Sequence, residues 1–137
     1  MPTPKNAKAL SLEQIYEALE NLLSSFTPPL EAFSRKIPRK RNFSIRIPKA
    51  VSIPPAYGGK PVQLDLASVI LQEGYVGFYF MPVYMNPSLR KKLAPALLKT
   101  LKGKTCFHIK KLDDSQLANI EFALCEGVKC YKTKGWL

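Results

Sequence analysis

Apolar residues recur at intervals of three and four near the start of the chain and predict an amphipathic helix over residues 12–25. Ser11 and Gln14 have the spacing of a capping box at its first turn. Pro28 and Pro29 end this helix, because proline has no backbone N–H to donate. The predicted apolar face comprises Leu12, Ile15, Tyr16, Leu19, Leu22, Leu23 and Phe26.

The middle of the chain has the period of two that is typical of strands. Prolines punctuate residues 27–61 and exclude a continuous helix there. Gln72, Glu73 and Gly74 form a predicted hairpin turn, and residues 57–61 form another turn. The predicted extended segments are residues 43–47, 51–53, 62–71, 75–81 and 105–109. In the 62–71 segment, Val62, Leu64, Leu66 and Ile70 are expected on one face, with Gln63, Asp65 and Ala67 on the other.

Two more helices are predicted in the second half of the chain. Asn86 and Pro87 mark the start of the first, and Pro95 should break or kink it. Its apolar stripe is Leu89, Leu93, Leu97 and Leu101, with Gly103 just past its end. Asp113 and Gln116 open the last helix with a second capping box. Its stripe is Leu117, Ile120, Leu124 and Val128, interrupted by Gly127.

This order of elements predicts an α+β fold, in which an antiparallel sheet of about five strands has helices packed mainly on one face. The 137 residues suit a single domain, residues 1–137, with a flexible N-terminal tail over residues 1–10. The three cysteines contain no C-x-x-C pair, which argues against a disulfide framework and a closed four-ligand zinc site. No signal peptide and no membrane span are recognised, so we expect a cytoplasmic protein.

Charge is the most unusual property of the composition. Lys and Arg number 21, against 10 Asp and Glu. Residues 32–64 contain eight basic residues and no acidic one, and residues 74–112 also contain eight basic residues and no acidic one. Such a field attracts phosphates, nucleic acids or acidic protein partners, although lysines also serve solubility alone.

The sheet face turned away from the helices is the first candidate site. The strand alternation predicts that it carries Ser44, Arg46, Asp65, Tyr75, Tyr79, Cys106 and His108. Arg46 could hold a carboxylate or phosphate with two hydrogen bonds, and Tyr79 and His108 could donate further ones. The alternative is the solvated face of an ordinary antiparallel sheet.

Cys106 and His108 are predicted on the same side of one strand, which invites a comparison with thiol catalysis. A thiol–histidine pair normally needs a third, orienting group, and the sequence identifies none. No phosphate-binding loop, metalloprotease or serine-hydrolase motif occurs in the chain. We therefore expect a binding module rather than an enzyme.

A dense basic run is the candidate nucleic-acid interface. It comprises Arg35, Lys36, Arg39, Lys40 and Arg41 and is flanked by Phe33 and Phe43. Basic side chains could neutralise phosphates while aromatic rings stack on bases. No sequence signature of a known nucleic-acid-binding fold accompanies the run.

The stretches 77–82 and 101–112, together with Gly127, Tyr131, Lys134, Gly135 and Trp136, resemble the YdhG-like family of small bacterial proteins. The likeness covers residues 43–137. One branch of that family has been described as a frataxin-like intracellular iron chaperone, so the resemblance implies iron as a possible cargo.

An iron role would call for a cluster of carboxylates, since iron in such sites favours oxygen ligands. The candidates are Glu13, Glu17 and Glu20, whose spacing aligns them on the first helix. The alternative is a plain solvated helix face. Three functions therefore remain open: binding of a small anion on the open sheet face, iron transport, and nucleic-acid binding.

Overall fold

A six-stranded antiparallel sheet organises the computed structural model, which describes residues 10–52 and 61–137. The strand order is β1-β2-β5-β6-β8-β7, so β1 and β7 form the two edges. The strands are β1 (Glu31–Phe33), β2 (Asn42–Arg46), β5 (Asp65–Leu71), β6 (Val76–Phe80), β8 (Cys106–Ile109) and β7 (Leu101–Lys102). A separate two-stranded ladder joins β3 (Val51–Ser52) to β4 (Pro61–Val62).

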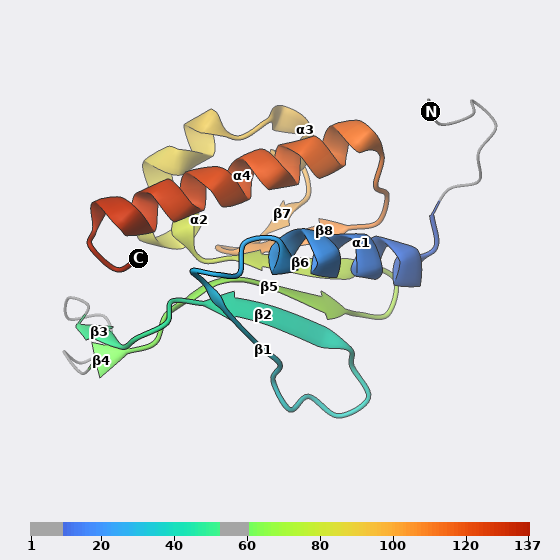
Figure 1. Cartoon of the computed structure of the whole chain (residues 1–137). Coiled ribbons are helices and arrows are strands. Elements are labelled where there is room, and N and C mark those ends of the chain that lie inside the picture. The colour runs from blue at the N-terminus through green and yellow to red at the C-terminus, as the bar shows by residue number, and fades with distance from the viewer. Residues whose placement is uncertain (1–9, 53–60) are drawn as a thin grey trace.

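Helices cover one side of this sheet (Figure 1). Helices α1 (Leu12–Ser24) and α4 (Asp114–Thr133) lie across it, and three short helical turns connect β6 to β7. These turns are α2 (Pro82–Met85), η2 (Pro87–Lys92) and α3 (Pro95–Leu98). The predicted α+β class, with helices on one face of an antiparallel sheet, is therefore confirmed. No helix in the described part of the chain is long and apolar enough to cross a membrane.

Helix α1 forms as its sequence predicts. The Ser11 hydroxyl accepts a hydrogen bond from the Gln14 backbone N–H at 3.1 Å, and the Gln14 side chain accepts one from the Ser11 backbone N–H at 2.8 Å. These two bonds satisfy backbone donors that have no partner inside the helix. The residues buried from α1 are Ile15, Tyr16, Leu19 and Leu23, all from the predicted apolar face.

The hydrophobic core lies between the sheet and the two long helices. Its centre is a group of phenylalanines on neighbouring strands, in which the Phe78 ring lies 5.7 Å from those of Phe80 and Phe107. All three side chains are fully buried. The strand alternation predicted for β6 and β8 is thus confirmed, because every second residue of these strands enters the core.

A β-bulge in β5 overturns the predicted faces of that strand. Ile45 pairs with Ala67, but the next residue, Arg46, pairs with Asp65, so Leu66 is the extra residue. The bulge shifts the alternation by one position. As a result Ala67 lies on the helix side with the buried Ile45, whereas Ile70 shares the other face with Asn42. A bulge has no local signature in an apolar run such as this one.

The helix predicted from Pro87 breaks before Pro95, in agreement with the predicted effect of that proline, but it does not extend to Leu101. Two short turns, η2 and α3, occupy the segment, because Pro87 and Pro95 each start a turn and the backbone is extended at Leu93 and Ala94. Leu101 belongs to strand β7 instead of a helical stripe, and Gly103 (φ +84°) turns the chain from β7 into β8.

Edge strands β1 and β7 were not predicted, because three and two residues are too few to show a period. The turn expected over residues 57–61 lies outside the described residues except for Pro61, which begins β4. The flexible tail predicted over residues 1–10 also falls outside them, apart from Leu10.

One long-range hydrogen bond ties the last helix to the bulged strand. The hydroxyl of the buried Tyr131 in α4 donates to the backbone carbonyl of Asp65 at 2.7 Å. We expect Tyr131→Phe to lower the free energy of unfolding by about 1.5 kcal/mol, because the carbonyl loses its donor while the ring remains. Urea unfolding measures the change. Tyr84→Phe, at a largely exposed ring, is the control, and an equal loss in both variants would contradict this role of Tyr131.

Candidate functional site

The sheet face turned away from α1 and α4, here called the open face, carries the seven residues predicted to share it. The pairing register places Ser44, Ser68, Tyr79 and Cys106 in one row across four strands. Arg46 pairs with Asp65, and His108 lies two residues beyond Cys106. The ring of Tyr75 stacks on His108. These side chains form three neighbouring groups rather than one concave site. From the β1 edge toward the β7 edge, the groups are Arg46 with Asp65, Ser44 with Ser68 and Tyr79, and Cys106 with Tyr75 and His108.

The group beside β1 is a network of ion pairs in which each arginine has a carboxylate partner within the protein. Arg46 contacts the Glu31 carboxylate at 2.8 Å, and its guanidinium lies 4.3 Å from the centre of the Phe33 ring. Arg35 pairs with Asp65. Burial raises the pKa of the Asp65 carboxyl above its ordinary value, and the Arg35 and Arg46 guanidinium groups offset only part of that rise. Arg46 already has a carboxylate partner inside the protein, so a free anion would have to compete with Glu31.

The side chains of the middle group are packed together and leave little space for a ligand. The hydroxyls of Ser44 and Ser68 are 2.7 Å apart and both side chains are buried. The hollow between β5 and β6 that Ser68 and Tyr79 line has a volume of about 30 Å³. Small-molecule sites measure about 300 to 1,000 Å³, so this hollow is too small for an organic ligand.

Cys106 and His108 do lie on the same side of β8, but their surroundings do not favour thiol catalysis. Burial raises the pKa of the Cys106 thiol, and a hydrogen bond with Tyr79 offsets part of the rise. A thiol with a raised pKa remains protonated near neutral pH, whereas the thiolate is the nucleophile. The His108 ring faces Tyr75 at a centroid distance of 3.9 Å with an interplanar angle of 11°.

The third group adjoins a hollow at the β7 edge of the sheet that is lined mainly by lysines, here called the lysine groove. It has a volume of about 360 Å³ and is lined by Lys99, Thr100, Lys102, His108, Lys110, Lys111 and Gln116. All four lysines are exposed. No acidic side chain lines the groove, and none of its lysines takes part in an ion pair among the described residues.

Strand pairing and chain reversal bring these lysines together. Lys99 ends α3, Lys102 lies in β7 opposite Cys106, and Lys110 and Lys111 directly follow β8. The backbone N–H of His108 donates to the Thr100 carbonyl at 2.8 Å, which holds the two segments side by side. Sequence reasoning noted the acid-free run over residues 74–112 but did not single out these lysines, because the hairpin that joins them was not predicted.

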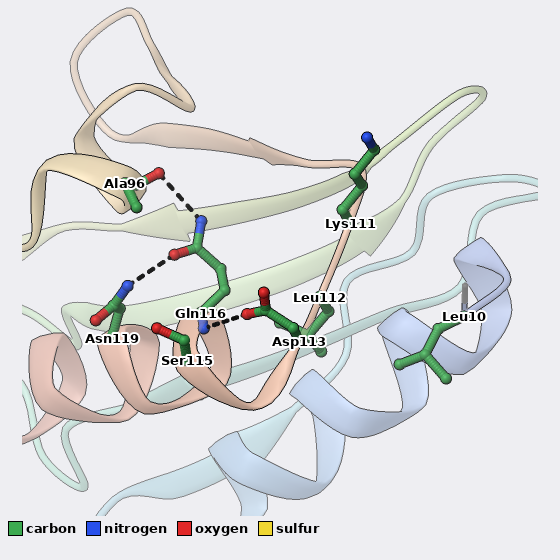
Figure 2. A pocket seen from close by; sticks show the side chains of 8 residues that line it. All are labelled: Leu10, Ala96, Lys111, Leu112, Asp113, Ser115, Gln116 and Asn119. Atoms are coloured by element: carbon green, nitrogen blue, oxygen red, sulfur yellow. Dashed lines mark hydrogen bonds between the residues drawn. The ribbon is translucent and has the colours of Figure 1, made fainter. Parts of the chain in front are cut away.

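A second hollow of about 400 Å³ adjoins the lysine groove at the start of α4 (Figure 2). Lys111 and Gln116 line both hollows. The Gln116 side chain is held in place, since its amide donates to the Ala96 carbonyl at 3.2 Å and its oxygen accepts from Asn119 at 2.9 Å. Asp113 caps the helix through the Gln116 backbone N–H at 2.7 Å. These hydrogen bonds hold the start of α4 and fix the Gln116 side chain between the two hollows.

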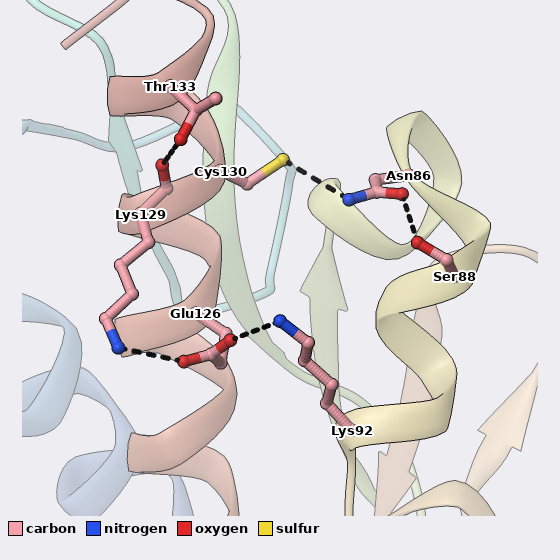
Figure 3. Close-up of polar contacts among 7 residues, drawn as sticks. All are labelled: Asn86, Ser88, Lys92, Glu126, Lys129, Cys130 and Thr133. Atoms are coloured by element: carbon pink, nitrogen blue, oxygen red, sulfur yellow. Dashed lines mark hydrogen bonds and ion pairs between the residues drawn. The ribbon is translucent and has the colours of Figure 1, made fainter.

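A third hollow, of about 380 Å³, lies between α4 and η2 (Figure 3). Two of the three lysines that line it share one carboxylate, because Glu126 contacts Lys92 at 3.4 Å and Lys129 at 3.2 Å. The hydrogen bond from Lys129, followed by that from Lys92, lowers the pKa of Glu126. A carboxylate inside this hollow disfavours an anionic ligand, in contrast to the lysine groove.

The basic run proposed for nucleic acid lies in the loop between β1 and β2, and its members serve mainly to hold that loop. Arg35 pairs with Asp65, and Lys40 donates to the Gln72 side chain. Arg41 lies 3.6 Å from Glu17 and covers the Tyr16 ring. Lys36 and Arg39 are exposed. The two flanking phenylalanines belong to opposite sheet faces, since Phe33 pairs with Ser44 and Phe43 pairs with Val69.

The three glutamates proposed for iron are not gathered into a metal site. Glu17 pairs with Arg41, and Glu20 accepts a hydrogen bond from the Tyr16 hydroxyl. Burial together with that bond raises the pKa of Tyr16. Within residues 10–52 and 61–137, no group of three or more His, Cys, Asp or Glu side chains could hold a metal ion. Iron binding through Glu13, Glu17 and Glu20 therefore stays a prediction.

Comparison of the chain with protein-family models, with curated proteins and with solved structures found no match.

Proposed function

We propose that this protein is a binding module for a small phosphate-bearing anion, which it holds in the lysine groove. The observation that carries the proposal is the set of four exposed lysines around one hollow, with neither an acidic lining residue nor an ion-pair partner. The proposal keeps the anionic ligand predicted from the sequence and moves its site from Arg46 to the opposite edge of the sheet.

Electrostatics supports this choice of ligand. Like charges held close together raise the free energy of the folded protein, and a bound anion relieves their repulsion. Lysine ammonium groups bind phosphate as compact charges with three hydrogen-bond donors each. Because the four lysines are exposed, salt screens them, and the affinity should fall as ionic strength rises.

The size of the groove supports a small ligand. Its volume of about 360 Å³ lies at the lower end of the range for small-molecule sites, which runs from about 300 to 1,000 Å³. Thr100 and Gln116 add polar lining to its charged rim. The iron-carrying role that the YdhG-like resemblance implies gains no such support, and neither does nucleic-acid binding through Arg35–Arg41.

Inorganic pyrophosphate is a suitable probe for the groove. We expect the double variant Lys102→Glu/Lys110→Glu to bind pyrophosphate about tenfold more weakly than the original protein, a difference of about 1.4 kcal/mol. Two attractive charges become repulsive in this variant, and solvent screening keeps the effect moderate. Isothermal titration calorimetry at low ionic strength measures both affinities.

The matched control is Lys36→Glu/Lys49→Glu, which changes the net charge equally at exposed positions near the β1 and β2 side of the sheet. The control should retain most of the affinity. An equal loss in both double variants would show a diffuse charge effect and would refute a specific groove, as would the absence of pyrophosphate binding by the original protein.

A further inference from the structure

A stacked aromatic pair borders the lysine groove. The rings of Tyr75 and His108 are nearly parallel, with centroids 3.9 Å apart and an interplanar angle of 11°. His108 belongs to both features, because it also lines the groove. The groove therefore adjoins a flat π surface on the open face as well as a cluster of positive charge.

The two residues of the pair are partly exposed to solvent. Both Tyr75 and His108 are half-buried. Across the sheet His108 pairs with Gly77, which has no side chain of its own to cover the histidine. The Tyr79 ring folds over Gly77 instead, so closely that a Cβ at that glycine would lie 2.8 Å from Tyr79 Cε1. Three aromatic side chains thus gather around one backbone position beside the groove.

Lysines on two neighbouring segments lie close to His108. Side chains on one face of a strand repeat every ~7 Å, so Cys106 and His108 are separated by that interval along β8, and Lys110 is the first residue after the strand ends. Lys102 pairs with Cys106 from β7. Lys102 on the neighbouring strand and Lys110 just past the end of β8 therefore line the same groove as His108.

We propose that the ligand of the lysine groove is a nucleotide unit, whose phosphate contacts the lysines and whose base stacks against the Tyr75–His108 pair. This inference rests on the proposed function and adds the chemical class of the ligand. Every base has a π face, and stacking on aromatic side chains, histidine included, is a general way to bind one. The shared chemistry is that of a free nucleotide or of one residue in a single strand.

Phe33, another partly buried aromatic residue of this face, does not offer the same surface. Guanidinium groups cover Phe33, with Arg46 4.3 Å and Arg35 5.1 Å from its ring centre. Both arginines also pair with carboxylates of the protein. Stacking at Phe33 would require these contacts to break, whereas the Tyr75–His108 pair lies next to lysines without ion-pair partners among the described residues.

Two ligands that differ only by a base test the inference directly. Adenosine 5′-monophosphate and ribose 5-phosphate carry the same phosphate ester, so the lysines should contact both equally. We expect the original protein to bind the nucleotide about tenfold more tightly, the effect of one stacked base. Tyr75→Ala should remove that preference, Tyr75→Phe should keep it, and Tyr84→Ala, at an exposed ring outside the groove, should leave it unchanged.

The outcomes separate this inference from the proposed function. Equal affinity for the two ligands, with pyrophosphate still bound, would overturn the nucleotide while leaving the anion site intact; this comparison needs no variant. Loss of preference in Tyr84→Ala as well as in Tyr75→Ala would overturn the role of the aromatic pair. A short single-stranded oligonucleotide that binds more tightly than the mononucleotide, with the same dependence on Tyr75, would support the inference and identify a strand as the source.

Discussion

Replacing Phe78 with alanine is expected to lower the free energy of unfolding by about 4 kcal/mol. Phe78 is fully buried in the middle strand β6, where its ring contacts those of Phe80 and Phe107. Truncation removes a large apolar surface from the core and leaves a cavity that the flanking strands cannot easily fill, because they are held by sheet hydrogen bonds on both sides. Urea unfolding followed by circular dichroism measures the loss.

The same chain supplies a matched control. Phe122 lies on α4 with 46% of its surface exposed, so Phe122→Ala should change the stability by less than about 0.5 kcal/mol. Similar losses in the two variants would contradict the position of Phe78 at the centre of the core. A changed denaturant slope would indicate that the unfolded state or the cooperativity had changed as well.

Replacing Gly127 with valine is expected to cost about 3 kcal/mol, through overpacking rather than through a cavity. Gly127 lies where α4 approaches the end of β6, and a Cβ added there would be 2.8 Å from Phe80 Cζ and 2.9 Å from Pro82 Cγ. Phe80 is fully buried and cannot move aside without disturbing the core. Thermal and urea unfolding of the variant measure the effect.

The variant Gly127→Ala tests the close contact through the sign of its change in stability. In an exposed helix, Gly→Ala stabilises by about 1 kcal/mol, so a stabilised Gly127→Ala variant would contradict the close contact. We expect it to be destabilised instead. The control for valine is Ala118→Val at an exposed position of the same helix, where only the helix propensity of about 0.5 kcal/mol is lost.

Gly127 shows why helix propensity alone misleads. From the sequence it is an interruption of the last helix at a cost of up to about 1 kcal/mol relative to alanine. In the structure it is the residue that allows α4 to lie close to Phe80 and Pro82. The two contacts come from residues more than forty positions earlier in the chain, and no local pattern around Gly127 reports them.

The elements that could be predicted are those in which burial repeats with a local period. Helix α1 with its capping box, the start of α4 at Asp113, and strands β6 and β8 all follow from spacing and end signals. The segment after Asn86 could not be predicted in the same way. Leucines at helical spacing are present there, but two prolines divide the segment into short turns that bury their leucines separately.

Which residues lie on the open face could be predicted, but how their side chains pair with one another could not. Alternation is sufficient to place Tyr79, Cys106 and His108 on one side of the sheet. It does not show that Arg46 pairs with Glu31 on the neighbouring strand β1, because β1 itself was not predicted. From the sequence, Arg46 was therefore expected to be free to bind an anion, whereas in the structure it is already paired with Glu31.

By itself, the sequence determined the fold class, the two long helices, the central strands and the strong positive charge, because each of these depends on local periodicity or on composition. Only the tertiary structure decided where that charge is concentrated. Lys99 and Lys102 meet Lys110 and Lys111 because β7 pairs back onto β8, and Tyr75 reaches His108 because β6 pairs with β8 on its other side. Pairing between segments distant in sequence brings these side chains to one edge of the sheet, and no spacing along the chain encodes that meeting.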